Sequence, residues 1–177
     1  MMGAKVPIFI SRPSELADDQ QATYNELVDI LTSENLELRR LGDSDYPSDY
    51  PLKEVAIISQ KCSGAVILGF AQTIVSAESG KVALGWVAPS TKKTDKKKSF
   101  HFATPWNNLE AGILFGLKLP LLVFREDGIK GGVFDDGVTD VFLQKLPRGG
   151  FGDKLESVVY SVQNWVSKVR CHYRKWD

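Results

Sequence analysis

The chain alternates short apolar runs of strand length with longer segments whose apolar residues recur at helical spacing, and this alternation limits the possible folds more than any other feature. Five runs are predicted to be strands: Val6–Ser11, Leu36–Leu41, Gly64–Ala71, Leu119–Arg125 and Val141–Leu146. Four segments are predicted to be helices: Asp18–Asn35, Leu52–Cys62, Thr104–Leu117 and a C-terminal helix that follows Asp153. A short helix fits the last of the five runs almost as well as a strand. Because strands separated by helices are joined by right-handed parallel crossovers, the sequence predicts an α/β three-layer sandwich with a central, mostly parallel sheet of about five strands.

Two helix starts carry capping signals. Thr104 followed by Pro105 is a strong signal, because threonine caps the first turn and proline suits the first helical position. Asp153 and Glu156 have the spacing of a capping box, in which two side chains satisfy free backbone N–H groups. These signals predict where the third helix and the C-terminal helix begin.

One segment, from about residue 72 to 103, interrupts the alternation of strands and helices. Its first half has apolar spacing that would suit a small hairpin, around Ile74, Val75, Val82, Leu84, Trp86 and Val87. Its second half contains the lysines Lys92, Lys93, Lys96, Lys97 and Lys98. We expect a solvated, mobile excursion from a single domain that spans residues 1–177, and the alternative is a phosphate-binding patch.

Composition excludes several classes of partner. The chain has 22 basic and 22 acidic side chains in 177 residues, and this balance gives no overall attraction to nucleic acid or to anionic lipid. No apolar stretch is long enough to cross a bilayer, and the N-terminus lacks the cleavage pattern of a signal peptide. Cys62 and Cys171 form no CxxC pair, so we expect two thiols in a cytoplasmic protein without a metal site.

The sequence lacks the usual motifs of nucleotide redox and hydrolase chemistry. Neither a GxGxxG fingerprint nor a P-loop follows the first strand. His101 and His172 are the only histidines, and neither lies beside a nucleophile-elbow sequence, so a Ser-His-Asp triad is disfavoured. We expect His101 to be a loop or core residue.

In a doubly wound sheet the ligand lies beyond the carboxyl ends of the strands, so the residues just after each strand are the candidates. Ser11 and Arg12 end the first strand, and Glu110 lies four residues after Trp106 near the start of a helix. One carboxylate can break an N-glycosidic bond, because it can stabilise or attack a cationic ribosyl centre. Trp106 would stack on a base or ribose, and Arg12 would pair with phosphate oxygens. The alternative is structural: Glu110 is a first-turn acid that favours the helix dipole, and Trp106 is a core residue.

Two motifs resemble Toll/interleukin-1 receptor (TIR) domains. The first is IFISRP at the end of the first strand, and the second is the Trp-x-x-x-Glu spacing of residues 106–110. In TIR domains that cleave NAD this glutamate is catalytic. By this resemblance Gly42–Pro51 is the loop that closes over the nucleotide or mediates assembly.

A second family, the nucleoside 2-deoxyribosyltransferases, shares these features. Its catalytic glutamate is followed by glycine two residues on and by proline at the start of the next strand, as at Glu110–Gly112 and Pro120. The chain departs from that family after the third strand, where Gln72-Thr73 stands in place of an aspartate-rich turn. Both families are flavodoxin-like and both break N-glycosidic bonds.

The resemblance covers about residues 6 to 124 and implies hydrolysis or cyclisation of NAD, with a cyclic ADP-ribose-type signal in anti-phage defence as one outcome. The alternatives are a nucleoside 2-deoxyribosyltransferase or nucleotide N-glycosidase, and a non-catalytic nucleotide-sensing scaffold. NAD would be a substrate, with no separate cofactor, and self-association or an effector protein is the expected partner. The site residues are Glu110 as the catalytic residue and Ser11, Arg12, Tyr46, Trp106 and Asn107 as substrate-binding residues.

Overall fold

The computed structural model describes residues 4–46, 48–77, 98–138 and 143–174. Its main sheet has five strands, all parallel, in the order β2-β1-β3-β6-β7. The strands are β1 (Val6–Ser11), β2 (Leu36–Arg39), β3 (Ala65–Gly69), β6 (Leu121–Arg125) and β7 (Leu143–Lys145). The predicted fold class is therefore confirmed, and the final run is a strand.

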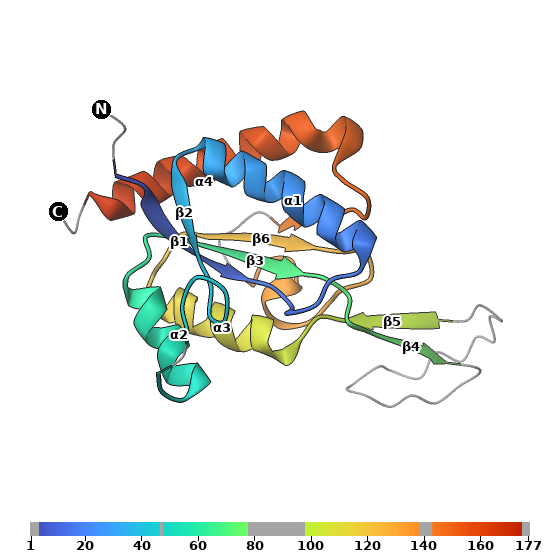
Figure 1. The fold of residues 1–177 in the computed structure, drawn as a ribbon. Coiled ribbons are helices and arrows are strands. Elements are labelled where there is room, and N and C mark those ends of the chain that lie inside the picture. Colours follow the sequence, from blue (N-terminus) through green and yellow to red (C-terminus); the bar gives the residue numbers. More distant parts are fainter. Residues whose placement is uncertain (1–3, 47, 78–97, 139–142, 175–177) are drawn as a thin grey trace.

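Helices cover both faces of this sheet, so the molecule has three layers (Figure 1). The helices are α1 (Asp18–Ser33), α2 (Pro51–Gln60), α3 (Pro105–Gly116) and α4 (Leu155–Tyr173). Ile8 and Ile10 of β1 pack in one buried cluster with α1 and α4, whereas Phe9, between them, packs in a second cluster with α2 and α3. This alternation follows from the strand period of two, and because all five residues of β3 are buried, the sheet is covered on both sides.

The strand order places a topological switch point between β1 and β3. From β1 the chain adds β2 on one side, and from β3 it adds β6 and β7 on the other. The helices that leave these strands diverge at this point and leave room for a ligand beyond the carboxyl ends of the strands. Ser11, the last residue of β1, lies at this edge.

A separate antiparallel hairpin follows β3 and extends away from the main sheet (Figure 1). It pairs β4 (Thr73–Ala77) with β5 (Lys98–Phe102). Of the hairpin expected in the first half of the excursion, Ile74 and Val75 lie in β4, which pairs with β5 at the end of the excursion, and Val82, Leu84, Trp86 and Val87 lie outside the described residues. Residues 78–97, with all but one of the clustered lysines, lie outside the described residues, so the phosphate-binding patch stays a prediction.

Most boundaries differ from those predicted by one or two residues, and two of the differences have a clear local cause. The second strand ends at Arg39 and not at Leu41, because Arg40 turns into a loop whose backbone N–H groups bond to the Arg40 carbonyl. The C-terminal helix begins at Leu155 after a 3-10 turn, η2 (Gly152–Lys154), and its N-cap residue makes no side-chain cap bond. The predicted capping box at Asp153 is therefore wrong. Among the described helices, none has both the length and the apolar character needed to cross a membrane.

Candidate functional site

The start of α3 is tied to the end of β1 by a chain of side-chain hydrogen bonds. The Thr104 hydroxyl accepts from the Asn107 backbone N–H at 3.4 Å, as an N-cap should, and donates to Asn107 Oδ1 at 2.9 Å. Asn107 Nδ2 then donates to Ser11 Oγ at 2.8 Å. Ser11 and Asn107 are each only 1% exposed, so the polar groups of this chain are paired where water is excluded.

Glu110 lies one helical turn beyond Asn107 and is half-buried. Burial raises the pKa of its carboxyl, while a hydrogen bond with Ser11 and the positive charge of Arg40 act in the opposite direction. Because the Ser11 hydroxyl accepts from Asn107, its own hydrogen is available to the Glu110 carboxylate. Ser11, Asn107 and Glu110, three of the predicted site residues, are therefore brought together.

The structural alternative for α3 is wrong in both parts. The first turn of α3 contains no acidic residue, since Glu110 lies in its second turn. Trp106 is not a core residue, because 46% of its surface is exposed. A half-exposed indole beside a half-buried carboxyl leaves a flat apolar surface available to a ligand.

Two arginines lie at the ends of β1 and β2 and share one carboxylate. Arg12 and Arg40 approach Asp43 Oδ2 at 3.7 and 3.4 Å, with side chains only 12% and 16% exposed against 58% for Asp43. Both also donate to the carbonyl of Pro13. The Arg12 guanidinium lies 4.6 Å from the centre of the Tyr24 ring, and its buried Nε has no hydrogen-bond partner among the described residues. This part of the site therefore has more positive than negative charge, and one N–H of Arg12 lacks an acceptor.

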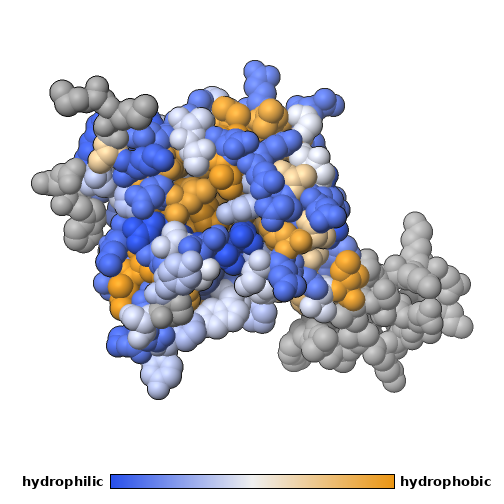
Figure 2. Space-filling view, viewed as in Figure 1, coloured by the Kyte–Doolittle hydropathy of each residue, from blue (hydrophilic) through white to orange (hydrophobic). Residues whose placement is uncertain are grey.

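Tyr46 is not part of this group. It is 81% exposed on a loop that Arg39 and Asp45 fix by an ion pair, which lowers the pKa of the Asp45 carboxyl. The loop passes in front of α3 in Figure 1, and Figure 2 shows hydrophilic residues in the middle of this face. The role of Tyr46 in substrate binding stays a prediction.

Sequence reasoning missed two charged residues at this edge of the sheet. Arg40 follows β2, and Glu126 follows β6 and is only 4% exposed. Glu126 comes directly after the predicted apolar run Leu119–Arg125, so the rule that selected Arg12 could have found it. Arg40 lay inside the predicted strand Leu36–Leu41, and only the structure shows that this strand ends at Arg39.

In the described part of the chain, no cluster of three or more His, Cys, Asp or Glu residues could hold a metal ion. Cys62 and Cys171 are both free, and burial raises the pKa of the Cys62 thiol to about 12. That thiol is therefore protonated at neutral pH and is a poor nucleophile.

Comparison with known proteins gives one informative likeness. No protein-family model matches the chain. No curated protein matches it either. Among solved structures, the chain resembles the CMP N-glycosidase BcmB of Clostridium botulinum, with a TM-score of 0.50 and 10% identity over 86% of this chain and 96% of that one. The chain therefore has a fold like that of a nucleotide N-glycosidase, and the comparison does not single out TIR domains.

Proposed function

We propose that this protein is a nucleotide N-glycosidase that hydrolyses the bond between base and ribose in a nucleoside monophosphate. The observation that carries the proposal is Glu110, a half-buried carboxyl hydrogen-bonded by Ser11 at the switch point of the sheet. The likeness of the fold to that of a CMP N-glycosidase supports the same class of reaction. Of the activities expected from the sequence, this one agrees best with the fold.

The reaction needs Glu110 in its ionised form. The carboxylate stabilises positive charge at C1′ or attacks that carbon as the N-glycosidic bond breaks. The electron pair of the broken bond leaves with the base, which takes a proton from solvent. Water then adds to C1′ and releases a proton, so the products are the free base and ribose 5-phosphate. The hydrogen bond from Ser11 favours the ionised carboxylate and keeps it in position.

The arginine pair favours a phosphorylated substrate over a nucleoside. Phosphate oxygens would replace the exposed carboxylate of Asp43 beside the terminal nitrogens of Arg12 and Arg40. Trp106, half-exposed on the same helix as Glu110, would stack on the base. Ser11, itself bonded by Asn107, hydrogen-bonds the Glu110 carboxyl.

The direct test is to incubate the protein with CMP, UMP, AMP and GMP and to measure the released base by chromatography. Cytidine and the other nucleosides are the matched substrates that lack phosphate, and Glu110→Gln is the matched inactive variant. We expect base release from at least one monophosphate and little from its nucleoside. Release by the Gln variant at the wild-type rate would contradict the proposal.

NAD cleavage is the second candidate, and the spacing of half-exposed Trp106 and half-buried Glu110 on one face of α3 favours it. Incubation with NAD tests this activity: nicotinamide, ADP-ribose and cyclic ADP-ribose are its products, whereas a nucleoside monophosphate would give its free base. Assays over a range of protein concentrations test whether self-association is needed. A protein that releases neither product but binds a nucleotide would instead be a sensing module.

A further inference from the structure

A large cavity in the described part of the chain lies away from Glu110, at the amino end of β6. It has a volume of about 1090 Å³ and lies between the C-terminal half of α3 and the middle of α4. Its apolar wall comes from Phe115, Leu119, Leu121, Leu122 and Trp165. Pockets of roughly 300–1,000 Å³ hold typical small ligands, so this space is large enough for one.

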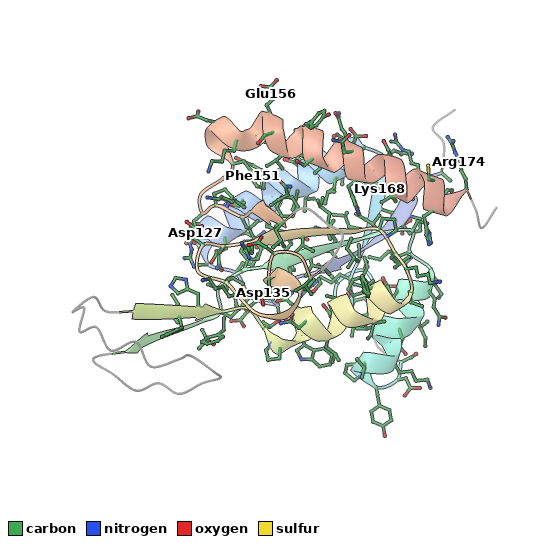
Figure 3. The ribbon with its side chains drawn as sticks, turned by 180° about the vertical axis from the view of Figure 1, so that it is seen from behind. Asp127, Asp135, Phe151, Glu156, Lys168 and Arg174 are labelled. Carbon is green, nitrogen blue, oxygen red and sulfur yellow. The ribbon has the colours of Figure 1, made fainter. Side chains whose placement is uncertain are left out.

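Two lysines, Lys118 and Lys168, line this cavity together. Both also line a smaller adjoining pocket of about 400 Å³, so their side chains share one rim. Figure 3 shows Lys168 on α4, on the side of the molecule where α4 lies above β6 and α3 lies below it. No acidic residue is among the described residues that line either pocket, and no described ion pair includes either lysine. Two positive charges on one rim that no acidic residue lines favour an anion there.

Lys118 occupies a backbone position that suits glycine. Its φ is 58°, and it follows α3 at the point where Leu119 N–H bonds back to the Leu114 carbonyl at 3.2 Å. This is the left-handed helix end that glycine usually takes, because a side chain there is strained. A lysine anywhere in the last turn would interact well with the helix dipole, so the dipole does not explain a lysine at this position.

We propose that this cavity is a second ligand site, separate from Glu110, for a small amphipathic anion. The apolar body of the ligand lies on Phe115, Leu121 and Trp165, and its anionic head lies between Lys118 and Lys168. Asn164, one helical turn before Lys168 on α4, also lines the cavity and supplies a hydrogen-bonding group near the head. The ligand class is a carboxylate or similar anion on an aliphatic chain or an aromatic ring.

The test is calorimetric titration of the full chain with two probes, decanoate for a chain and 1-naphthoate for a ring. We expect saturable binding of one equivalent of at least one probe, and the better probe identifies the shape of the apolar body. Decanol, which keeps the chain and lacks the charge, should bind at least about tenfold more weakly than decanoate.

Variants separate this site from the surface in general. The Lys118→Gln, Lys168→Gln double variant should weaken binding of the anionic probe about tenfold and leave decanol unchanged. Lys130→Gln, at an exposed loop position, is the matched control and should have no effect. Asn164→Trp fills the cavity from the exposed side of α4 and should prevent binding of both probes.

Lys118→Gly separates function from stability. It removes backbone strain and one charge, so it should raise the melting temperature while it weakens binding of the anion. Glu110→Gln should bind the probes as the wild type does, whether or not the protein proves to be a glycosidase.

Several results would overturn the second site. These are no binding of either acid up to about 1 mM, equal binding of decanoate and decanol, or full binding by the double lysine variant. Binding of a peptide with a C-terminal leucine carboxylate but of neither small acid would also overturn it, since the cavity would then be a peptide site.

Discussion

Glu110 and Glu126 are two carboxyls at the same edge of the same sheet, and their surroundings differ. Glu126 is 4% exposed, and both of its oxygens accept hydrogen bonds: Oε1 from Gln20 Nε2 at 2.9 Å, and Oε2 from the Ala71 N–H at 2.9 Å. Arg148, itself half-exposed, adds a contact at 3.3 Å. Glu110 is only half-buried and is hydrogen-bonded by the Ser11 hydroxyl.

This difference in surroundings indicates different roles for Glu110 and Glu126. A carboxylate whose acceptors are all used by the protein holds segments together, and here it joins α1, the turn after β3 and the end of β6. A carboxylate with acceptors left over, in a partly open place, can serve a substrate. The comparison therefore predicts that Glu110 matters for rate and Glu126 for stability.

The largest expected effect is on catalysis by Glu110→Gln. The amide keeps the shape of the side chain but cannot support a cationic ribosyl centre, so base release should fall by about 1,000-fold. Stability should be unchanged or slightly higher, because burial raises the pKa of Glu110 and ionisation of this carboxyl therefore works against folding. Base release and urea unfolding measure the two effects. A large loss of stability would mean that Glu110 holds the fold together as Glu126 does, and the predicted difference between the two residues would be wrong.

Glu126→Ala should act on folding. It leaves the buried N–H of Ala71 and the amide of Gln20 without their acceptor, and we expect a loss of about 3 kcal/mol in the free energy of unfolding. Urea unfolding measures the loss, with Glu126→Gln as the variant that keeps one acceptor. Base release per folded molecule should remain near the wild-type value, and a 100-fold loss would show that Glu126 also serves the reaction.

Asn107→Ala should lower both the stability and the rate, each by less than the Glu126 and Glu110 variants do. Asn107 is 1% exposed and bonds Ser11 and Thr104, so its removal should destabilise the protein by about 2 kcal/mol. The rate should fall as well, because Ser11 loses the donor that orients its hydroxyl toward Glu110. A fall in kcat with little change in KM is the expected signature, and a change in KM alone would place Asn107 against the substrate instead.

The pH dependence of base release sharpens the assignment of Glu110. An ionised catalytic carboxylate with a raised pKa makes the rate fall as the pH drops through that pKa, which lies above the ordinary value of 4.5. Ser11→Ala removes a hydrogen bond that lowers the pKa of Glu110, so this acid limb should move to higher pH. A limb that stays in place would mean that another group controls it.

Tyr46→Ala should have the smallest effect. Tyr46 is 81% exposed, so the free energy of unfolding should change by less than about 0.5 kcal/mol. Unchanged kinetics would place Tyr46 outside the site. A raised KM with kcat intact would show that the substrate reaches this loop, as expected from the resemblance to TIR domains.

The strands show what local pattern can predict. Val6–Ser11 and the run around Ala65–Gly69 are apolar and of strand length, and Thr104-Pro105 begins α3 as predicted, because threonine caps and proline starts a helix through contacts within a few residues. The cap predicted at Asp153 failed, because Asp153 itself lies in the 3-10 turn η2 that precedes α4. Local pattern also could not predict the pairing of β4, because its partner β5 lies beyond residues 78–97.

The sequence by itself determined the layered α/β class, the parallel crossovers and the position of Glu110 near Ser11, since strand ends share one edge of a parallel sheet. Only the tertiary structure decided that Arg40 and Asp43 flank this group, that Glu126 is held by Gln20 and Ala71, and that a cavity opens between α3 and α4. The physical reason is separation along the chain: Gln20 and Glu126 are 106 residues apart, and no local propensity encodes such a contact.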